Sequence, residues 1–407
     1  MQEGIDWLND LNVRGIKLGL ESIKGLLAKL DNPQNGLSII HVAGSDGKGS
    51  VCCMIESILM AAGYKVGMFN TPHILKVNEC IRINGRDIND DQFDSLLLDV
   101  KKASESMECT NFEALTACAF LCFKREDVDF AVIEVGMGGR EDATNVIVPT
   151  VSVINNISLE HTAFLGNTLA EIAYQKAGIM KKGVPCVTLN RGEALDALIR
   201  YSKEVGCELS VVDTDELEVL SNEKSGLLIR YQCKNYWVGI PGRYQARNAA
   251  LAIDAVRNLP DCERIEQFIN IGLEDAFWPY RMEKINDRVV LDVTHTREGA
   301  ESLKENIPEI YGRVTLVTAM LNDKDLDGVA EILSEIADRV YVTSVDSPRA
   351  ASKELLAESY KKFHGDVTVC DCIDDAMELA LKNEGTVLVT GSFRTAEGCL
   401  RWLRRTQ

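Results

Sequence analysis

The chain has 407 residues, with 44 Lys and Arg against 62 Asp and Glu, so its formal charge is −18 at pH 7. This acidic balance argues against nucleic-acid binding, which needs clustered positive charge, and the length suggests two or three domains. The 13 cysteines form no C-x-x-C pair, no stretch has the length of a transmembrane helix, and the N-terminus lacks the apolar run of a signal peptide. We therefore expect a cytoplasmic protein that binds neither nucleic acid nor a membrane.

Strand and helix patterns alternate along the chain, which is typical of an α/β protein with a mainly parallel sheet. In the first half we expect helices over Ser50–Ala62 and Leu169–Lys182, the latter ended by Gly183 and Pro185. The expected strands of this half are Ser38–Ala43, Val66–Phe69, Asp129–Glu134, Val151–Ile154 and Val184–Leu189.

A second alternation of strands and helices begins beyond residue 280. It is preceded by a strand-rich segment, Leu227–Ile240, and by a segment with helical spacing, Arg243–Arg257. Helices such as Leu326–Ala337 and Leu355–Lys362 separate five expected strands, which are Val289–Val293, Val314–Val317, Val340–Thr343, Val367–Cys370 and Val387–Thr390. We therefore place a boundary near residues 280–288 and predict a larger domain over residues 1–282 and a smaller one over residues 283–407.

The segment that says most about function is a glycine-rich turn between an expected strand and an expected helix, His41–Ser50. Its glycines allow backbone N–H groups to point at an anion, and the helix start adds a positive dipole end. Lys48 can place a charge on the β- and γ-phosphates of a nucleotide, and Ser50 can offer a hydroxyl to Mg²⁺. Gly49 separates these two residues, so the strict Walker pattern is not met, and the alternative is a βα turn of any Rossmann-like domain.

Two further candidates follow later strands. Glu134 ends the strand Asp129–Glu134, and His161 lies in the loop beyond Val151–Ile154. The carboxyl ends of parallel strands form the ligand-binding edge of an α/β sheet, so Glu134 can bind Mg²⁺ beside the glycine-rich turn. The alternatives are an exposed strand-end acid and a structural histidine.

Ordered motifs extend from about residue 7 to the C-terminus. They are Leu18–Glu21, Asn32–Gln34, the glycine-rich turn, Thr71–His73, Ile81–Gly85, Phe112-Glu113 with Thr116, Glu134–Asn145, Lys176–Ile179, Gln245 with Asn248, Trp278-Pro279 with Arg281, Asp292 with His295, and Asp346–Arg349. With these motifs the chain resembles the folylpolyglutamate synthase/dihydrofolate synthase family of the Mur ligase superfamily.

The resemblance implies an α/β fold with an N-terminal P-loop-type Mur ligase central domain and a smaller C-terminal Rossmann-like domain. It implies an ATP-dependent amide ligase, which phosphorylates the carboxylate of a pteroate or folate acid and lets the amine of L-glutamate displace the phosphate. The implied cofactors are ATP and two Mg²⁺ ions, and we expect a monomer whose partners are these small molecules.

The resemblance also implies roles for individual residues. The ATP-binding positions are Gly44, Ser45, Asp46, Gly47, Lys48, Gly49, Ser50, Gln245, Asn248, Arg281 and Asp292. The metal ligands are Ser50, Glu134, His161 and Lys176, and Lys176 would be carbamylated and thus carboxylate-like. The substrate-binding positions are Thr71, Pro72, His73, Arg82, Ser347 and Arg349, with Ser392 as a further candidate. The catalytic positions are Lys48, Lys176, His161, Asp292 and His295. Without the resemblance, Lys176 would be an ordinary cation on an amphipathic helix, and the loop residues would be surface positions.

Some positions depart from the family pattern. Asp46 stands where the family usually has Asn, Cys80 where Arg is common, and Glu160 where Asp precedes the histidine. Thr296-Arg297 replaces Asn-Pro. These departures keep two other hypotheses open, which are the same ligase chemistry on another carboxylated acceptor such as a modified pterin, and a catalytically silent nucleotide-binding homologue. Arg297 would either pair with a substrate carboxylate or be a surface arginine.

Overall fold

The computed structural model describes residues 3–15, 17 and 19–406, so Leu18 of the first motif lies outside the described residues. The chain divides into two compact units, which are considered separately below. The first unit takes the chain up to Glu218 together with Arg230–Tyr236 and Gln245–Ala276. The second takes Val219–Ile229, Trp237–Tyr244 and the chain from Phe277 onward. The boundary between residues 282 and 283 stays a prediction.

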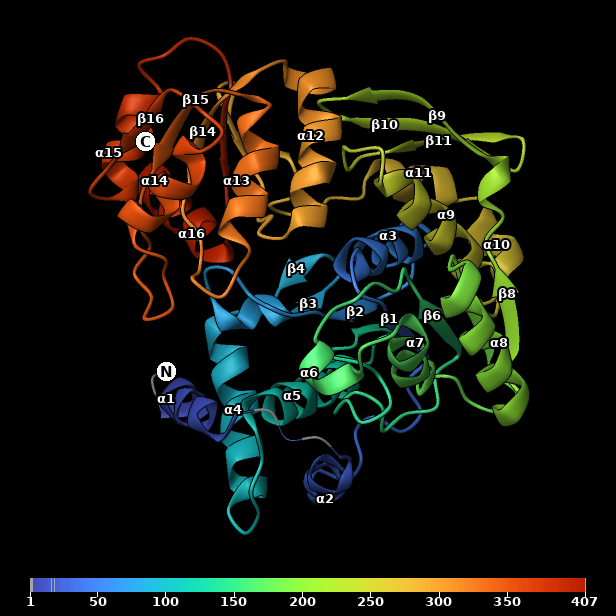
Figure 1. Ribbon diagram of the computed structural model, residues 1–407. Helices are drawn as coiled ribbons and strands as arrows, with labels where there is room; N and C mark the ends of the chain where they lie inside the picture. The colour runs from blue at the N-terminus through green and yellow to red at the C-terminus, as the bar shows by residue number, and fades with distance from the viewer. Residues whose placement is uncertain (1–2, 16, 18, 407) are drawn as a thin grey trace. The chain divides into compact units, whose positions relative to one another are not determined.

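The first unit is built on an eight-stranded sheet with the order β4-β3-β2-β5-β1-β6-β7-β8. Figure 1 labels its strands β1, β2, β3, β4, β6 and β8. The central strand β1 pairs in parallel with β5 on one side and β6 on the other, while β3 and β4 form an antiparallel edge next to β2. The strands are β1 Ile39–Ala43, β2 Val66–Phe69, β3 Ile81–Ile83, β4 Arg86–Asp87, β5 Phe130–Glu134, β6 Val151–Ile154, β7 Pro185–Thr188 and β8 Glu208–Val211.

Helices cover both faces of this sheet, so its central strands are buried throughout and are mostly apolar, with His41, Glu134 and Ser152 as polar members. Helices α3 and α9 pack on one face, and α5 and α7 belong to the cores on the other. The helices are α1 Glu3–Asp10, α2 Glu21–Lys29, α3 Lys48–Ala61, α4 Asp90–Ser104, α5 Asn111–Arg125, α6 Thr162–Leu165, α7 Leu169–Ala177, α8 Gly192–Val205, α9 Gln245–Val256, α10 Cys262–Glu266 and α11 Ile269–Glu274. Short 3₁₀ helices cover Leu11–Arg14, Val77–Cys80 and Thr214–Glu216.

A separate three-stranded sheet, β11-β10-β9, contains residues of both units. Its strands are β9 Leu217–Glu223, β10 Gly226–Tyr231 and β11 Lys234–Val238.

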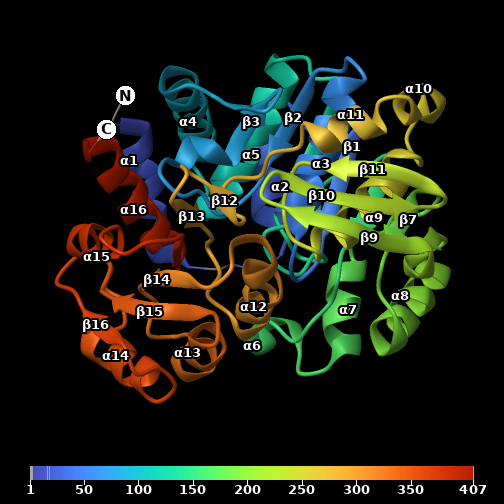
Figure 2. The same ribbon diagram turned by 90° about the horizontal axis from the view of Figure 1, so that it is seen from above.

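The second unit has a six-stranded sheet with the order β12-β13-β17-β14-β15-β16, and every pair except β12 with β13 is parallel. Helices α13 and α14 lie on one face of this sheet and α15 and α16 on the other (Figure 2). The strands are β12 Glu283–Lys284, β13 Val289–Leu291, β14 Val314–Thr318, β15 Ala337–Val342, β16 Val367–Val369 and β17 Val387–Thr390. The helices are α12 Arg297–Tyr311, α13 Leu326–Ser334, α14 Lys353–Lys361, α15 Ile373–Ala380 and α16 Phe393–Thr406.

The predicted α/β class is confirmed, and all the strands expected around the sheet centres form, with ends that shift by up to three residues. The prediction that helix α7 continues to Lys182 is wrong, because the helix ends at Ala177. A Cβ on Gly178 would come within 2.3 Å of the Arg140 backbone, and the Asn145 amide donates to the Gly178 carbonyl at 3.1 Å. The chain therefore leaves the helix at this close crossing.

All 13 cysteines are free thiols, and 10 of them are buried. Cys233 and Cys372 are exposed, and Cys262 is half-buried. In the described part of the chain no helix combines the length and apolar character needed to span a membrane.

Candidate active site

Residues Gly44–Ser50 of the glycine-rich turn lie between the end of strand β1 and the first turn of helix α3, and we call this segment the phosphate loop after its predicted role. Gly47 has φ of 74° and precedes Lys48, the first residue of α3, with no side chain capping the helix start. The first N–H groups of α3 are therefore available to an anion, which the helix dipole also favours. A Cβ on Gly47 would come within 2.7 Å of the side chains of Asn155 and Asn248, so the loop needs glycine at this position.

Two asparagines that directly follow strand β6 form hydrogen bonds with the backbone of the phosphate loop. The Asn155 amide donates to the Asp46 carbonyl at 2.9 Å and to Asn248 Oδ1 at 3.0 Å. The Asn156 side chain accepts from the Asp46 N–H at 3.0 Å, and its carbonyl accepts from the Ser45 N–H at 2.8 Å. These bonds hold the backbone at Asp46 while its side chain stays exposed. The acidic departure at this position therefore faces solvent.

Gln245 and Asn248 of helix α9 continue this network to the other end of the loop. Asn248 Nδ2 donates to Gln245 Oε1 at 2.8 Å, and Gln245 Nε2 donates to Ser50 Oγ at 3.2 Å. All three side chains are buried. The predicted pair thus lies on one helix face and orients the Ser50 hydroxyl.

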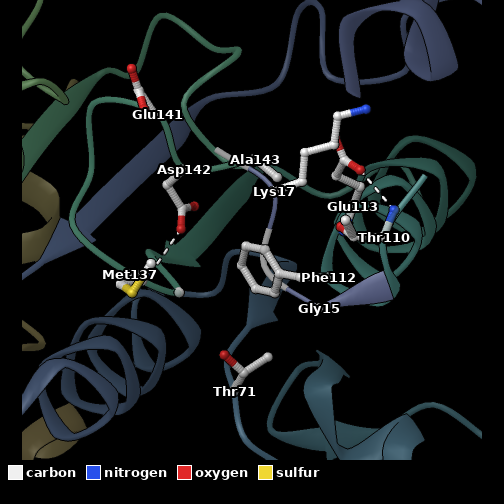
Figure 3. A pocket seen from close by; sticks show the side chains of 11 residues that line it. Gly15, Lys17, Thr71, Thr110, Phe112, Glu113, Met137, Glu141, Asp142 and Ala143 are labelled. Carbon is white, nitrogen blue, oxygen red and sulfur yellow. Dashed lines mark hydrogen bonds between the residues drawn. The ribbon is translucent and has the colours of Figure 1, made fainter. Parts of the chain in front are cut away.

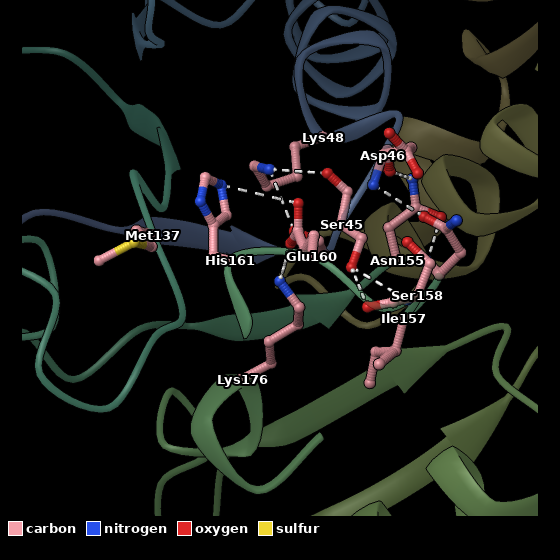
Figure 4. Close-up of polar contacts among 12 residues, drawn as sticks. Ser45, Asp46, Lys48, Met137, Asn155, Ile157, Ser158, Glu160, His161 and Lys176 are labelled. Carbon is pink, nitrogen blue, oxygen red and sulfur yellow. Dashed lines mark hydrogen bonds and ion pairs between the residues drawn. The ribbon is translucent and has the colours of Figure 1, made fainter. Parts of the chain in front are cut away.

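Lys48 and Lys176 both donate to the carbonyl of Gly44. Figure 4 shows the two lysines with Glu160 between them. Lys48 Nζ donates to the carbonyls of Gly44 and Ser45, both at 3.0 Å, and Lys176 Nζ donates to the Gly44 carbonyl at 2.8 Å. Lys176 also donates to Glu160 Oε1 at 2.7 Å, and only 1% of its side chain is exposed. Glu160 Oε2 lies 3.9 Å from Nε2 of His161. The structure thus brings the predicted residues Lys48, His161 and Lys176 together with Glu160, to which the sequence assigned no role, and the roles of the three stay predictions.

Burial governs the charges of this cluster. It lowers the pKa of Lys176 to about 8, against the opposing effect of the Glu160 carboxylate. Burial also acts to raise the pKa of Glu160, but Lys176 and Lys48 outweigh it and the net direction is downward. Glu160 is therefore an anion at neutral pH, and Lys176 has an unusually accessible neutral form.

The donor set beside the loop suits Mg²⁺. The part of the chain that the structure describes gathers no group of three or more His, Cys, Asp or Glu side chains of the kind that holds a metal unaided. Mg²⁺ usually binds through one or two protein oxygens together with phosphate oxygens and water. The buried hydroxyl of Ser50 and the buried carboxylate of Glu134, which ends strand β5 next to β1, are donors of this kind.

A cavity of about 230 Å³ lies in the same unit, and Phe112 forms one wall of it (Figure 3). We call it the Phe112 cavity; its lining includes Gly15, Thr71, Thr110, Phe112, Gly136 and Asp142. A Cβ on Gly136 would come within 2.5 Å of the Phe112 ring, so this ring rests directly on backbone. The cavity therefore offers a flat aromatic face and a carboxylate.

The Asp142 carboxylate is buried and held by several donors. Oδ2 accepts from the Met137 N–H at 2.8 Å, and Oδ1 accepts from the Thr144 N–H at 3.0 Å and from the Thr144 hydroxyl at 2.5 Å. Burial raises the pKa of Asp142, and these donors act in the opposite direction. Such an oriented carboxylate suits a ligand with neighbouring N–H groups.

In the second unit, Asp292 and His295 follow strand β13. Asp292 is buried and accepts from the N–H groups of Met282 at 2.9 Å and Thr294 at 2.8 Å. His295 Nδ1 lies 2.9 Å from the carbonyl two residues before it, so Nδ1 carries the proton and Nε2 is the acceptor. Its pKa is lowered, chiefly by burial and further by positive charges that include Arg281. The imidazole of His295 is thus neutral at physiological pH, with Nε2 as its acceptor.

The other candidates of the second unit take part in local contacts. Arg349 is exposed and paired with Asp323 at 2.5 Å, and its N–H donates to Ser347 Oγ at 3.2 Å. Ser392 accepts from the Thr395 N–H at 3.0 Å at the start of α16. The glutamate-side role of Ser347, Arg349 and Ser392 stays a prediction.

Arg297 is committed to its own unit. Its guanidinium lies 3.5 Å from Asp325 and 3.1 Å from Glu331, both within or next to α13. Pairing with a substrate carboxylate would require breaking these contacts. The structure therefore supports the surface interpretation of this departure.

The predicted substrate residues of the first unit separate into two groups. Thr71 lines the Phe112 cavity, whereas Pro72 and His73 are exposed and are not among its lining residues. Arg82 also lies outside the lining: it donates to the Gly85 carbonyl at 2.8 Å, and its guanidinium lies 3.7 Å from the buried carboxylate of Glu56. Through these two contacts Arg82 links the β3–β4 hairpin to helix α3.

Comparison with known proteins agrees with this geometry. The family model of the Mur ligase middle domain matches residues 42–256, and that of the Mur ligase glutamate ligase domain matches residues 280–393. The chain is 34% identical over 96% of its length to the dihydrofolate synthase/folylpolyglutamate synthase of Bacillus subtilis, 96% of which is covered. The chain belongs to the folylpolyglutamate synthase/dihydrofolate synthase family of Mur ligases. It is accordingly an ATP-dependent acid–amino-acid ligase.

Further relatives widen the comparison. A probable bifunctional folylpolyglutamate synthase/dihydropteroate synthase of Haloferax volcanii is 33% identical over 99% of the chain, and the chain spans 50% of that protein. A solved structure of Escherichia coli FolC in complex with DHPP and ADP superposes with a TM-score of 0.87 at 29% identity, covering 99% of the chain and 98% of FolC. A bifunctional folylpolyglutamate synthase/dihydrofolate synthase with Mn, AMPPNP and L-glutamate bound has a TM-score of 0.84 at 28% identity and 98% coverage of both chains.

Sequence analysis missed several residues that the structure places at the site. Asn155 and Asn156 directly follow a central strand, so the strand-end rule that selected Glu134 also applies to them. Phe112 and Asp142 lie inside recognised motifs, yet their local sequence does not reveal that they share one cavity.

Proposed function

We propose that this ligase joins L-glutamate to the carboxylate of a pteroate or folate acid, as a dihydrofolate synthase, a folylpolyglutamate synthase or both. One observation carries the proposal: the phosphate loop and the Phe112 cavity occur in the same unit, where the loop follows strand β1 and the cavity residues Gly136 and Asp142 follow the neighbouring strand β5. A pterin ring is flat and carries an amino group next to a ring N–H. The Phe112 ring and the Asp142 carboxylate match these two properties.

The reaction runs in two steps. An oxygen of the acceptor carboxylate attacks the γ-phosphorus of ATP, and ADP leaves, so that an acyl phosphate forms. The amine of glutamate then attacks the acyl carbon, loses a proton and expels phosphate, which leaves an amide. The first step needs alignment and charge neutralisation more than covalent help from the protein.

The residues around the phosphate loop divide these tasks. The N–H groups at the start of α3 and the Lys48 ammonium bind the phosphates, while the asparagine network behind the loop keeps its backbone rigid. Ser50 and Glu134 would hold Mg²⁺, which when bound neutralises phosphate charge. On the amino-acid side, the neutral imidazole of His295 is suited to accept the proton that the attacking amine loses.

Lys176 is the candidate for carbamylation. Its buried amine has a pKa of about 8, which favours reaction with CO₂, and the resulting carbamate would present oxygens beside His161 for a second Mg²⁺. Glu160 would have to release the lysine when the modification forms. The protein's free thiols support a cytoplasmic location, and we propose that it acts as a monomer.

The test is an acceptor panel. Purified protein with ATP, Mg²⁺ and glutamate should release ADP and form a glutamylated product only when dihydropteroate or a folate is added, as followed by ADP release and mass spectrometry. Omitting glutamate or the acceptor provides the controls. The absence of product with every pteroate and folate acid would refute the proposal. Better turnover of another carboxylated pterin would show that this compound, rather than a folate, is the acceptor.

A further inference from the structure

A buried chain of hydrogen bonds runs from strand β1 to the Phe112 cavity. His41 Nε2 lies 2.8 Å from the Thr144 hydroxyl, which in turn lies 2.5 Å from Asp142 Oδ1. All three side chains are at least nine-tenths buried. Of these three residues, Asp142 alone is among the described residues that line the cavity.

The direction of these bonds follows from the number of protons. The Thr144 hydroxyl has one hydrogen, which goes to the ionised Asp142 carboxylate. Its oxygen must then accept from His41, so the His41 proton is on Nε2. His41 Nδ1 has no hydrogen-bond partner among the described residues, which fits a lone pair there and a neutral ring. Burial, followed by the charge of Lys181, lowers the pKa of His41 to about 3 and keeps it neutral at physiological pH.

We propose that His41, acting through Thr144, is a positioning residue for acceptor recognition, because its Nε2–H fixes the Thr144 hydroxyl in the orientation that holds the Asp142 carboxylate toward the ring-binding cavity. The inference rests on the proposed function, since it takes the ligand to be a flat ring with adjacent N–H donors. The main-chain N–H groups of Met137, Thr144 and Gly136 hold both oxygens of the carboxylate, and the Thr144 hydroxyl is the side-chain donor among its described contacts.

The position of His41 gives this arrangement a second consequence. His41 lies three residues before Gly44, on the same strand that leads into the phosphate loop. The Asp142 carboxylate, which would bind the ring, is therefore linked through Thr144 to the strand that leads into the phosphate loop. This tie keeps the acceptor ring at a fixed offset from the phosphate loop, which helps to align the distant carboxylate of the acceptor.

The sharpest test is Thr144→Val, which removes the hydroxyl at nearly constant volume, with Thr144→Ser as the matched variant that keeps it. Binding of dihydropteroate and of its 2-desamino analogue is measured by calorimetry in the wild type and both variants. We expect Thr144→Val to weaken dihydropteroate binding about tenfold or more, and the desamino analogue much less, whereas Thr144→Ser stays within about threefold of wild type. ATP affinity should be unchanged in all three proteins.

His41→Leu should reproduce the effect of Thr144→Val on acceptor binding, and thermal unfolding and ATP affinity check that the variant is folded. Equal weakening of both ligands, or no weakening by Thr144→Val, would overturn the inference while leaving the proposed function intact. Failure of the proposed function would be seen separately in the acceptor panel. In that case the wild-type protein forms no glutamylated pteroate, even if it binds the ring.

Discussion

The phosphate loop of the first unit and the strand-end loops of the second hold their charged side chains in opposite ways. Lys176 is 1% exposed and is bound by both a carboxylate and a backbone carbonyl, whereas Arg349 is 64% exposed and pairs with a carboxylate that is itself 43% exposed. A buried pair is costly to break because the remaining charge stays desolvated, while an exposed pair contributes about 0–1 kcal/mol. Substitution of Lys176 should therefore change chemistry, whereas substitution of the exposed Arg349 should change little.

The largest effect is expected for Lys48→Ala. Among the described residues, two lysines donate to the carbonyls of Gly44 and Ser45, which are Lys48 and the buried Lys176. The substitution removes the first of them. Turnover should fall by at least about a hundredfold because transition-state charge is left unbalanced. Lys24→Ala, which removes an exposed lysine of α2, is the control and should be neutral. Robust ADP release by Lys48→Ala would break the comparison.

Lys176→Ala should come next, with a loss of about a hundredfold in turnover. Removing the side chain leaves Glu160 without its closest cation and abolishes the carbamate. A small carboxylic acid in solution should restore part of the activity, while the exposed Lys182→Ala should behave as wild type. If activity survives the substitution, the hypothesis that Lys176 is carbamylated for catalysis is wrong. The mass of the intact protein in bicarbonate buffer tests for the modification directly.

The pH dependence of carbamate formation is a smaller and more specific effect. The pKa of Lys176 is about 8, and only the neutral amine reacts with CO₂. Below this value each unit of falling pH lowers the neutral fraction about tenfold, so reactivation of CO₂-depleted protein should slow as pH falls and level off above about pH 8. Recovery of activity at constant dissolved CO₂ measures the rate. If the reactivation rate stays constant between about pH 6 and about pH 8, the reaction does not depend on an amine that titrates in this range.

The smallest effect is expected for Arg297→Ala. Its exposed pairs with Asp325 and Glu331 should be worth less than about 1 kcal/mol of unfolding free energy, and the KM for glutamate should change less than about twofold. Lys362→Ala, which breaks an exposed pair with Asp327, is the matched control. A tenfold rise in the glutamate KM for Arg297→Ala alone would show that the guanidinium leaves its partners to bind substrate.

The parts of the fold that could be predicted are those with a strong local signal. Val66–Phe69, Val151–Ile154 and Val387–Thr390 are short apolar runs buried on both faces, and the structure gives them the predicted ends. The β3–β4 hairpin has no such signal, because its strands have three and two residues and depend on pairing with β2. The early end of α7 depends on Arg140, a residue from another part of the chain.

The site shows the same division. The phosphate loop is one continuous segment, so its glycines, Lys48 and Ser50 could be recognised together. The contact between His41 and Thr144 joins residues 103 positions apart, and neither residue has a local pattern that predicts it. Glu160 drew notice only as a departure from the family pattern, and its role follows from its distance to Lys176.

The thiol pattern makes the protein a ready object for spectroscopy. Cys233 belongs to the first unit and Cys372 to the second, and both are exposed while 10 cysteines are buried. With Cys262 changed to serine, maleimide dyes would attach to one site on each unit of the otherwise native chain. Energy transfer between the dyes would then report whether the separation of the two labelled sites changes as nucleotide, acceptor and glutamate are added in turn.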